Sequence, residues 1–564
     1  QRENHEMGDL MTYQQDEPSF STPPQSSLSM STLSRSYFGL HFSVNSRKLA
    51  AAVAAVVLCT FLLTTSGGDV SPNALLVSLQ DSATLPQSSA VLHTGLGRID
   101  KAGYKWCFDC ESRCSNVIKA IEHHIGGLKE EDKKIKRAAL AKEEFAFFRG
   151  TDFIYLEDTL NSARMSDNSD DRQWEFAKLS TSQTWINADQ HMSNFGAFHD
   201  ALGRLVYDMN DFDEVMIGSY SIDLWRASVS ILLQARENRL SENDCRDLVR
   251  SFAYSYFVTV IGYVGNDNEL HFDMTYENTF GPVKAEIQTV LQKKSRSKML
   301  NKFAPLQNNV RRFAHTSQNA PVSQDVIRQF HEAWPAYISS CSQFHRRGKG
   351  KTAPAEKHPE DNNATFFAIK DISQRLGSGL GSLGNARYYV LIEGPSNSQE
   401  DDIILDVKYE PEPSWLDYAP QRLLQLNNFS NNGERILAGI KALSMHSSST
   451  VGYLMMEGDK AFLVRPRSPW KSAVDAATLK HVSQFRQVAT QMGQILATAH
   501  SRADNDYNED IIPWSFEREF AASVAMNEEA FVSSIIEPSV QWADRLRRDY
   551  DCWRTHYTQS QGFL

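Results

Sequence analysis

The sequence predicts an α+β protein made of several folded units. Three observations support this class. Long stretches with helical periodicity dominate residues 113–342, whereas short strand-like runs follow one another from residue 365. The 564 residues are also too many for one compact core. With 41% hydrophobic and 23% charged residues the composition is globular, and a net charge of −11 argues against nucleic acid as a partner.

The N-terminal region combines a polar tail with an apolar segment. Residues 1–46 are rich in Ser, Gln, Pro and Thr, and we expect them to be disordered. Leu49–Thr65 carries no charge and is just long enough to cross a bilayer, so residues 47–66 are expected to form a membrane anchor. A buried Ala/Val helix is the alternative. Because Arg47 and Lys48 precede the segment, we expect a single-pass protein whose C-terminal domain is lumenal or extracellular.

Six cysteines follow the apolar segment. An even number permits disulfides in an oxidising compartment, although the pairing stays open. Cys107 and Cys110, near the end of a stalk-like stretch over residues 67–112, and Cys114 just after it could instead form a metal site. Zinc is the weaker interpretation, because no matching Cys/His pair follows at the spacing of a zinc finger.

Residues 113–342 are expected to form a helical lobe that carries two acidic motifs. The strand-like run QTWIN precedes the motif DQHMSNFG, and the run LVYDM precedes the motif NDFDE. Amphipathic helices are expected over residues 222–236, 242–264 and 322–340. A basic cluster at residues 293–298 is read as a solvated loop.

After a polar linker at residues 343–364, residues 365–470 are expected to form a β-rich lobe. FFAIKDIS, ARYYVLIEG and DDIILDVKYE have the pattern of successive antiparallel strands. A helix near Glu434–Met445 and a hairpin at GYLMMEGDKAFLVRPR should follow. Residues 471–564 contain further helical periodicity and are expected to pack on the first lobe.

The two acidic motifs have the residue types that phosphoryl transfer requires. One carboxylate must orient or deprotonate the attacking hydroxyl, and oxygen ligands must hold magnesium close by. Asp189, with His191 beside it, is the expected catalytic residue, and Asn194, Asp211 and Asp213 are the expected metal ligands. The alternative is a polar loop followed by an Asn-Asp turn.

A glycine-rich run before ARYYVLIEG forms the expected nucleotide-binding loop. Glycines let the backbone approach phosphates closely. No Gly-Lys-Ser/Thr follows, which excludes a Walker loop, and a strand rather than a helix follows, which disfavours a Rossmann loop. A loop between two strands fits the kinase-type arrangement. The expected phosphate-contacting residues are Gly377, Ser378, Gly379, Gly381, Ser382 and Gly384.

Lys408 lies in the hydrophobic strand of DDIILDVKYE. A buried ammonium is costly unless it is paired, so we expect Lys408 to bind the nucleotide phosphates. Glu434, on the following helix, is a candidate ion-pair partner, and Glu410 competes with it. The alternative is a lysine that extends to solvent. Arg465 and Lys471, in a basic trio after a strand, are further phosphate-binding candidates of lower weight.

These motifs resemble those of known phosphotransferases. DQHMSN resembles the Asp-x-His-x-x-Asn catalytic loop of aminoglycoside and choline phosphotransferases, and DFDEVMIGSYSIDL resembles their metal motif, which ends in a structural Asp, here Asp223. More closely, FFRG with Arg149, ADQHMSNFG, NDFDE, LGSGLGSLG, DVKYE and AHSR resemble, in this order, the bacterial family called domain of unknown function 2252. Two residues depart from these patterns: Ala188 replaces the usual Gly, and Asn187 replaces the first His of the phosphotransferases.

The resemblance implies a kinase-like two-lobe fold that uses ATP and Mg²⁺. Because the glycine loop and Lys408 follow the catalytic loop in the chain, the fold would be circularly permuted, with the metal lobe first. The function it implies is a membrane-anchored phosphotransferase that moves the γ-phosphate of ATP to an unknown hydroxyl acceptor. Two alternatives stay open: a non-catalytic module that binds a nucleotide or a partner, and a metal-dependent phosphohydrolase.

Overall fold

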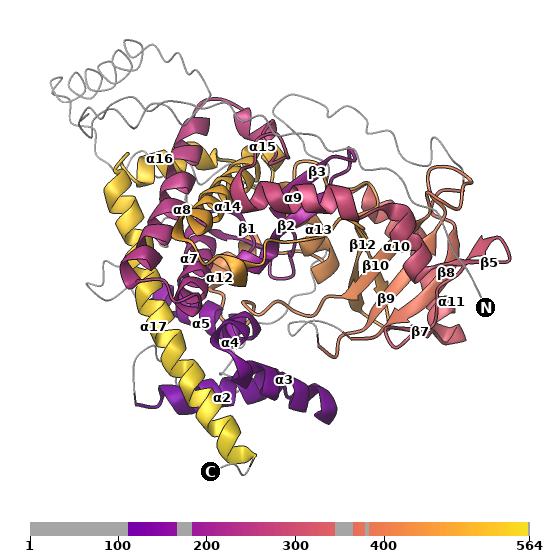
Figure 1. Ribbon diagram of the computed structural model, residues 1–564, viewed down its shortest axis with the longest axis horizontal. Helices are drawn as coiled ribbons and strands as arrows, with labels where there is room; N and C mark the ends of the chain where they lie inside the picture. Colours follow the sequence, from indigo (N-terminus) through magenta and orange to yellow (C-terminus); the bar gives the residue numbers. More distant parts are fainter. Residues whose placement is uncertain (1–110, 166–182, 345–364, 378–382, 562–564) are drawn as a thin grey trace, which may run out of the picture. The chain divides into compact units, whose positions relative to one another are not determined.

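The computed structural model describes residues 111–165, 183–344, 365–377 and 383–561 (Figure 1). The expected disordered tail, the apolar segment Leu49–Thr65 and nearly all of the stalk lie outside the described residues. Among the helices of the described part, none is long and apolar enough to cross a membrane.

Helices and antiparallel strands are both abundant, as the sequence predicts. The helices are α2 Arg113–His124, α3 Glu130–Lys142, α4 Glu144–Gly150, α5 Asp152–Met165, α7 Tyr220–Glu237, α8 Glu242–Tyr263, α9 Gly281–Lys293, α10 Arg296–Phe303, α11 Gln324–Cys341, α12 Gln421–Leu426, α13 Asn432–Leu443, α14 Val482–Arg502, α15 Asn505–Asn508, α16 Phe516–Ser523 and α17 Glu528–Ser560. The strands are β1 Gln183–Ile186, β2 Phe195–His199, β3 Leu205–Met209, β4 Met216–Ser219, β5 Leu306–Gln307, β6 Val310–Arg311, β7 Asn319–Pro321, β8 Ile369–Arg375, β9 Arg387–Ile392, β10 Ile403–Tyr409, β11 Gly452–Met456 and β12 Lys460–Pro466.

The helical part is built around α7, α8, α14 and α17. These helices pack on one another, and Figure 1 shows α17 alongside α7 and α8 and reaching α2. Their apolar faces form one core that includes Trp225, Phe252, Leu496 and Phe531. Ser241 starts α8 by accepting the backbone N–H of Asp244 at 3.1 Å, a typical N-cap. The helices predicted over residues 222–236 and 242–264 are confirmed.

The β-rich part is a six-stranded antiparallel sheet in the order β11-β12-β10-β9-β8-β7. Its strands alternate between two cores: Val390 and Val407 pack on the side of α11, whereas Leu391 and Ile404 pack on the side of α10. This alternation places Lys408 on the α10 side of β10. Strand β7 belongs to this sheet and α11 packs against it, so the β-rich part begins before the boundary expected at residues 343–364.

Two small antiparallel sheets support the acidic motifs. β1 pairs with β4, and β2 pairs with β3. DQHMSN follows β1 and leads into β2, and NDFDE connects β3 to β4. The strands predicted before both motifs are therefore confirmed, and the pairing brings the two motif loops to the same end of these sheets.

A disulfide joins the start of the described chain to its last helix. Cys114 of α2 is bonded to Cys552 of α17, so this sulfur is not a metal ligand, and the alternative zinc interpretation is wrong for Cys114. Beside it the buried guanidinium of Arg113 binds Asp158 and Asp549, each at 2.7 Å. A covalent bond and a buried ion-pair network therefore hold α2 and α17 together.

Candidate functional site

Asp223 at the start of α7 holds the backbone that precedes the DQHMSN loop. Its two carboxylate oxygens accept the N–H groups of Asn187 and Ala188, each at 2.7 Å, and its Oδ2 lies 3.2 Å from Nε2 of His500. All four residues are buried. Ala188 has a φ of 64°, in the left-handed region, which explains why glycine suits this position. The predicted structural position of Asp223 is thus accounted for.

Asp189 follows this turn and points one carboxylate oxygen at Arg226 of α7. Arg226 donates to Oδ1 from Nε at 2.8 Å, and its guanidinium also lies 3.9 Å over the ring of Phe148. The second oxygen, Oδ2, is 3.9 Å from His191 Nε2, outside hydrogen-bond range. Burial raises the pKa of Asp189 to about 7, against the opposing charge of Arg226. A carboxylate with this pKa suits a general base near neutral pH.

His191 is a buried, uncharged ring rather than a cation. Burial and the nearby charges of Arg149 and Arg226 hold its pKa well below the ordinary value. Its ring lies edge-on to Phe145 and Phe148, at centroid distances of 6.3 and 6.4 Å. Phe148 of the FFRG motif and Phe145, two residues before the motif, therefore line the DQHMSN loop, whereas the Arg149 side chain is exposed.

Backbone contacts connect the two acidic motifs. The Asn194 side-chain amide donates to the Asp189 carbonyl at 2.9 Å, and the Asn210 N–H donates to the Asn194 carbonyl at 3.0 Å. Gly196 permits this close packing, because a Cβ there would lie 2.6 Å from the Asn210 side-chain nitrogen and 2.5 Å from the Ser472 carbonyl oxygen. DQHMSN and NDFDE consequently form one unit.

Lys408 reaches this unit from the sheet. Its ammonium forms an ion pair with Asp213 and lies 3.4 Å from Glu410. Burial opposes ionisation of Asp211, but Lys408 and Arg465 lower its pKa below the ordinary value. Burial and Asp213 raise the pKa of Glu410 to about 8. The structure thus brings the predicted metal carboxylates and the predicted phosphate-binding lysine to one place.

Glu434 does not pair with Lys408, which corrects the expected ion pair. Its carboxylate instead accepts the Ser430 N–H at 2.6 Å, and its own N–H donates to the Asn431 side chain at 2.9 Å. This arrangement is a variant of the capping box at the start of α13, in which Glu434 binds the residue before the N-cap Asn431. The adjacent Arg435 was not predicted from the sequence. From α13 it donates a hydrogen bond to the Asp213 carbonyl at 2.9 Å.

The glycine loop connects β8 to β9. Gly377 and Gly384, at its two ends, have φ values of 74° and 85°, which glycine adopts without strain. Ser378, Gly379, Gly381 and Ser382 lie outside the described residues. The loop therefore connects two strands, as predicted. It leads into β9, which pairs with β10, the strand of Lys408.

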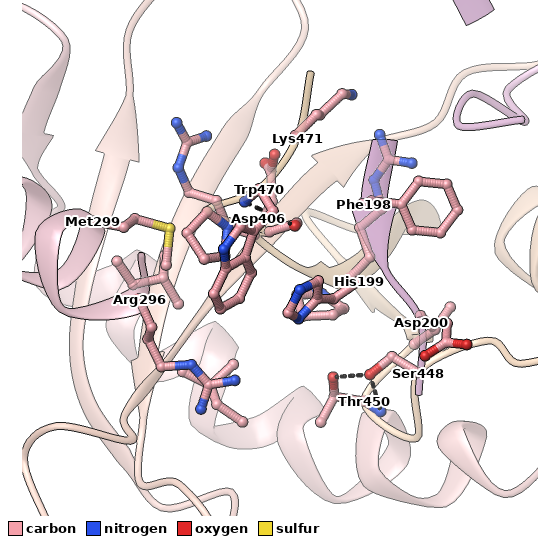
Figure 2. Close-up of a pocket in the computed structure, with 18 of the residues that line it drawn as sticks. Phe198, His199, Asp200, Arg296, Met299, Asp406, Ser448, Thr450, Trp470 and Lys471 are labelled. Carbon is pink, nitrogen blue, oxygen red and sulfur yellow. Dashed lines mark hydrogen bonds between the residues drawn. The ribbon is translucent and has the colours of Figure 1, made fainter. Parts of the chain in front are cut away.

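A cavity of about 980 Å³ opens beside the NDFDE motif. Asn210 and Phe212, which flank Asp211, line one end, and Arg465 and Lys471 lie on its wall. The rings of His199 and Trp470 stack within it at 3.7 Å, as Figure 2 shows. Arg465 at the end of β12 and Lys471 after this strand are therefore close to the site. Further cations come from the basic cluster at residues 293–298, which belongs largely to the end of α9 and the start of α10 rather than to a solvated loop.

Other residues of the site were not predicted. Arg226 and Arg435 sit on buried helix faces, and His500 of the AHSR motif binds Asp223 and receives or donates a hydrogen bond with Tyr256 at 2.9 Å. The only sequence signal for His500 was its place in the AHSR motif.

Comparison with known proteins gives one match. Neither the curated proteins nor the solved structures contain a match to this chain. A family model, described as an uncharacterized protein conserved in bacteria, matches residues 129–556 and so covers all the motifs above. The chain is therefore a member of the DUF2252 family.

Proposed function

We propose that this protein is an ATP- and Mg²⁺-dependent phosphotransferase that acts on a hydroxyl acceptor. The observation that carries the proposal is the ion pair between Lys408 and Asp213, which lie 195 residues apart. It joins the lysine of the sheet to the acidic motif of the helical part. Phosphoryl transfer needs a phosphate-binding cation and metal-binding carboxylates in one place.

Asp189 is the proposed general base. Its Oδ1 is held by Arg226, while Oδ2 remains for a substrate hydroxyl. With a pKa of about 7, it is ionised in about half of the molecules at neutral pH and can accept the hydroxyl proton. Arg226 fixes the orientation of the carboxylate and favours its charged form.

Lys408 and the glycine loop are the proposed nucleotide-binding elements. In protein kinases a glycine-rich loop covers the phosphates and the lysine lies on the third strand. Here the loop joins β8 to β9, and Lys408 lies on β10, the next strand along the chain and the neighbour of β9 in the sheet. This agreement supports the circularly permuted, kinase-like two-lobe fold.

The residues beside Lys408 fit a magnesium ion. Asp211, Asp213 and the Asn194 amide offer the hard oxygen atoms that Mg²⁺ prefers. The buried carboxyl group of Glu410 has no hydrogen-bond partner among the described residues, although the Lys408 ammonium lies 3.4 Å away, so its oxygens are open to an ion or to the water around the ion. Asn194, Asp211 and Asp213 would hold the ion, which neutralises phosphate charge when bound.

The proposed location is a membrane, with the C-terminal domain lumenal or extracellular. The Cys114–Cys552 disulfide supports an oxidising compartment. In sealed membranes, the C-terminal domain should resist protease added from the cytosolic side, and its digestion there would refute this location.

Incubation with γ-labelled ATP, Mg²⁺ and a small-molecule extract tests the activity. We expect label in an organic product, and loss of this product in Asp189→Asn and Asp211→Asn. Label released only as inorganic phosphate would favour a phosphohydrolase. Magnesium-dependent nucleotide binding without turnover would favour the non-catalytic module.

A further inference from the structure

The cavity beside Asp211 contains far more cations than anions. Ten lysine and arginine residues line it, but only three carboxylates do. Asp406, the central carboxylate, is already paired, because Arg387 binds it at 2.5 Å and Arg375 lies 3.4 Å away. The other two pair with cations outside the lining: Asp402 with Lys370 at 2.8 Å, and Asp200 with Arg204 at 2.7 Å.

The other eight lining cations form no direct ion pair with a carboxylate of the described residues, although Arg465 and Lys471 lie near enough to Asp211 to lower its pKa. Neutral acceptors orient several of them. Arg296 donates to the Asp401 carbonyl at 3.3 Å, and Lys294 donates to the Lys471 carbonyl at 2.6 Å. Arg467 donates to the Tyr389 hydroxyl at 2.7 Å. Carbonyl and hydroxyl groups position a cation without neutralising it, so the positive charge of the cavity remains.

This crowding of charge is unfavourable in the protein alone. Burial and the nearby Arg465 lower the pKa of Lys471 to about 8, although its side chain reaches solvent. Burial and Arg387 likewise lower the pKa of Arg375. Like charges held together at reduced dielectric repel one another, and a bound anion would relieve the repulsion.

The remaining walls suit a small polar molecule. Figure 2 shows the stacked His199 and Trp470 facing the cavity, with Arg296 opposite and the Ser448–Thr450 hydroxyl pair below. These two hydroxyls are 3.0 Å apart. The volume of about 980 Å³ is at the upper end of that of small-molecule sites.

We infer that this cavity binds the phosphoryl acceptor and that the acceptor is an anionic small molecule bearing phosphate or carboxylate groups. The acceptor role rests on the proposed function of the neighbouring site. Asn210 and Phe212 line the cavity on both sides of Asp211, so a ligand there adjoins the acidic motif. Lys293 and Lys294 lie at the end of α9, and Arg296 and Lys298 lie in α10, so these cations come from elements other than the glycine loop and the strand of Lys408. They serve the acceptor rather than the nucleotide.

Isothermal calorimetry with inorganic pyrophosphate in magnesium-free buffer tests this assignment. Arg296→Ala/Lys298→Ala removes two lining cations, and Lys284→Ala removes a cation of the same α9–α10 segment that does not line the cavity. We expect pyrophosphate affinity to fall at least about tenfold in the double variant and to stay within about twofold in the control. Thermal unfolding verifies that both variants fold.

A magnesium complex of a non-hydrolysable ATP analogue separates the two possible polyanions. Its affinity should change by less than about threefold in Arg296→Ala/Lys298→Ala. Equal loss of both ligands, with mutual competition, would assign the cavity to the nucleotide and overturn the acceptor assignment. Unchanged pyrophosphate affinity would overturn the anion site itself. Pyrophosphate binding through Arg296 and Lys298 with no nucleotide binding would retain the anion site and refute the phosphotransferase instead.

Discussion

Lys408 of β10 forms an ion pair with Asp213 of the NDFDE motif, across 195 residues of chain. Glu410, two residues farther along the strand, lies 3.4 Å from the same ammonium. The pair links the six-stranded sheet to the loop that also carries Asp211. A single lysine thereby connects the elements proposed to bind nucleotide with those proposed to bind metal.

Removing Lys408 should destabilise the protein as well as abolish activity. Breaking one partner of a buried pair typically costs about 3–5 kcal/mol. Since 37% of the Asp213 side chain is exposed, we expect Lys408→Met to lower the free energy of unfolding by about 2 kcal/mol. Denaturant unfolding measures it, with Lys460→Met at a surface pair as the control, expected to cost under about 0.5 kcal/mol. If both variants lower the free energy of unfolding equally, the Lys408–Asp213 pair contributes no more to stability than a surface pair.

Activity should follow the ionisation of Asp189. Its pKa is raised to about 7, so the base is protonated and inactive below this pH and active above it. We expect kcat/KM to rise with pH and level off above pH 7. Arg226 lowers this pKa, so Arg226→Gln should move the midpoint to more alkaline pH. An unchanged midpoint in this variant would contradict the assignment of the rise in kcat/KM to the ionisation of Asp189.

Asp223 should matter through the backbone it holds. Asn has only one oxygen, so Asp223→Asn leaves one of the two bound N–H groups unsatisfied in a buried position. We expect a loss of about 2–3 kcal/mol of unfolding free energy, together with a lower kcat and little change in nucleotide KM. Asp544→Asn, at an exposed pair, serves as the control. If the two substitutions cost the same, Asp223 does not have this role.

The left-handed φ of Ala188 predicts that two substitutions at this position differ in their effect on stability. Glycine accepts this φ without strain but loses a buried methyl group, so Ala188→Gly should change stability by less than about 1 kcal/mol. A β-branched residue is strained there, and Ala188→Val should cost at least about 2 kcal/mol. Thermal unfolding of both variants distinguishes these outcomes, and a stable Val variant would contradict the backbone geometry.

The Cys114–Cys552 bond should stabilise the whole described fold. It closes a loop of 438 residues, and the loss of a native disulfide commonly costs about 2–5 kcal/mol. Cys114→Ser and Cys114→Ser/Cys552→Ser should lower the thermal midpoint equally, since either change removes the same bond. A larger loss in the double variant would show that the two cysteines act separately.

Periodicity and local motifs predicted much of this molecule. Nearby residues determine the strands before DQHMSN and NDFDE, the two strands that the glycine loop connects, and the strand of Lys408. All of these strands are present. The need of Lys408 for a partner also followed from its burial. Its partner did not, because a single sequence does not show which distant carboxylate lies opposite a strand.

Glu434 illustrates the same limit. The pattern Asn431-Asn432-Gly433-Glu434 resembles a capping box, a local signal that was available and that would have assigned Glu434 to the start of α13. Arg226 and His500, by contrast, act through partners far along the chain. The same holds for β7, a strand of the sheet, and for α11, which packs on the sheet, because both positions depend on tertiary packing.

Titration calorimetry with a non-hydrolysable ATP analogue tests the central proposal most directly. We predict binding that requires Mg²⁺ and that is lost in Asp211→Asn and weakened in Lys408→Met, while Lys460→Met binds as the wild type does. Absence of any magnesium-dependent binding in the folded wild-type protein would contradict the assignment of Lys408, Asp211 and Asp213 to a nucleotide site.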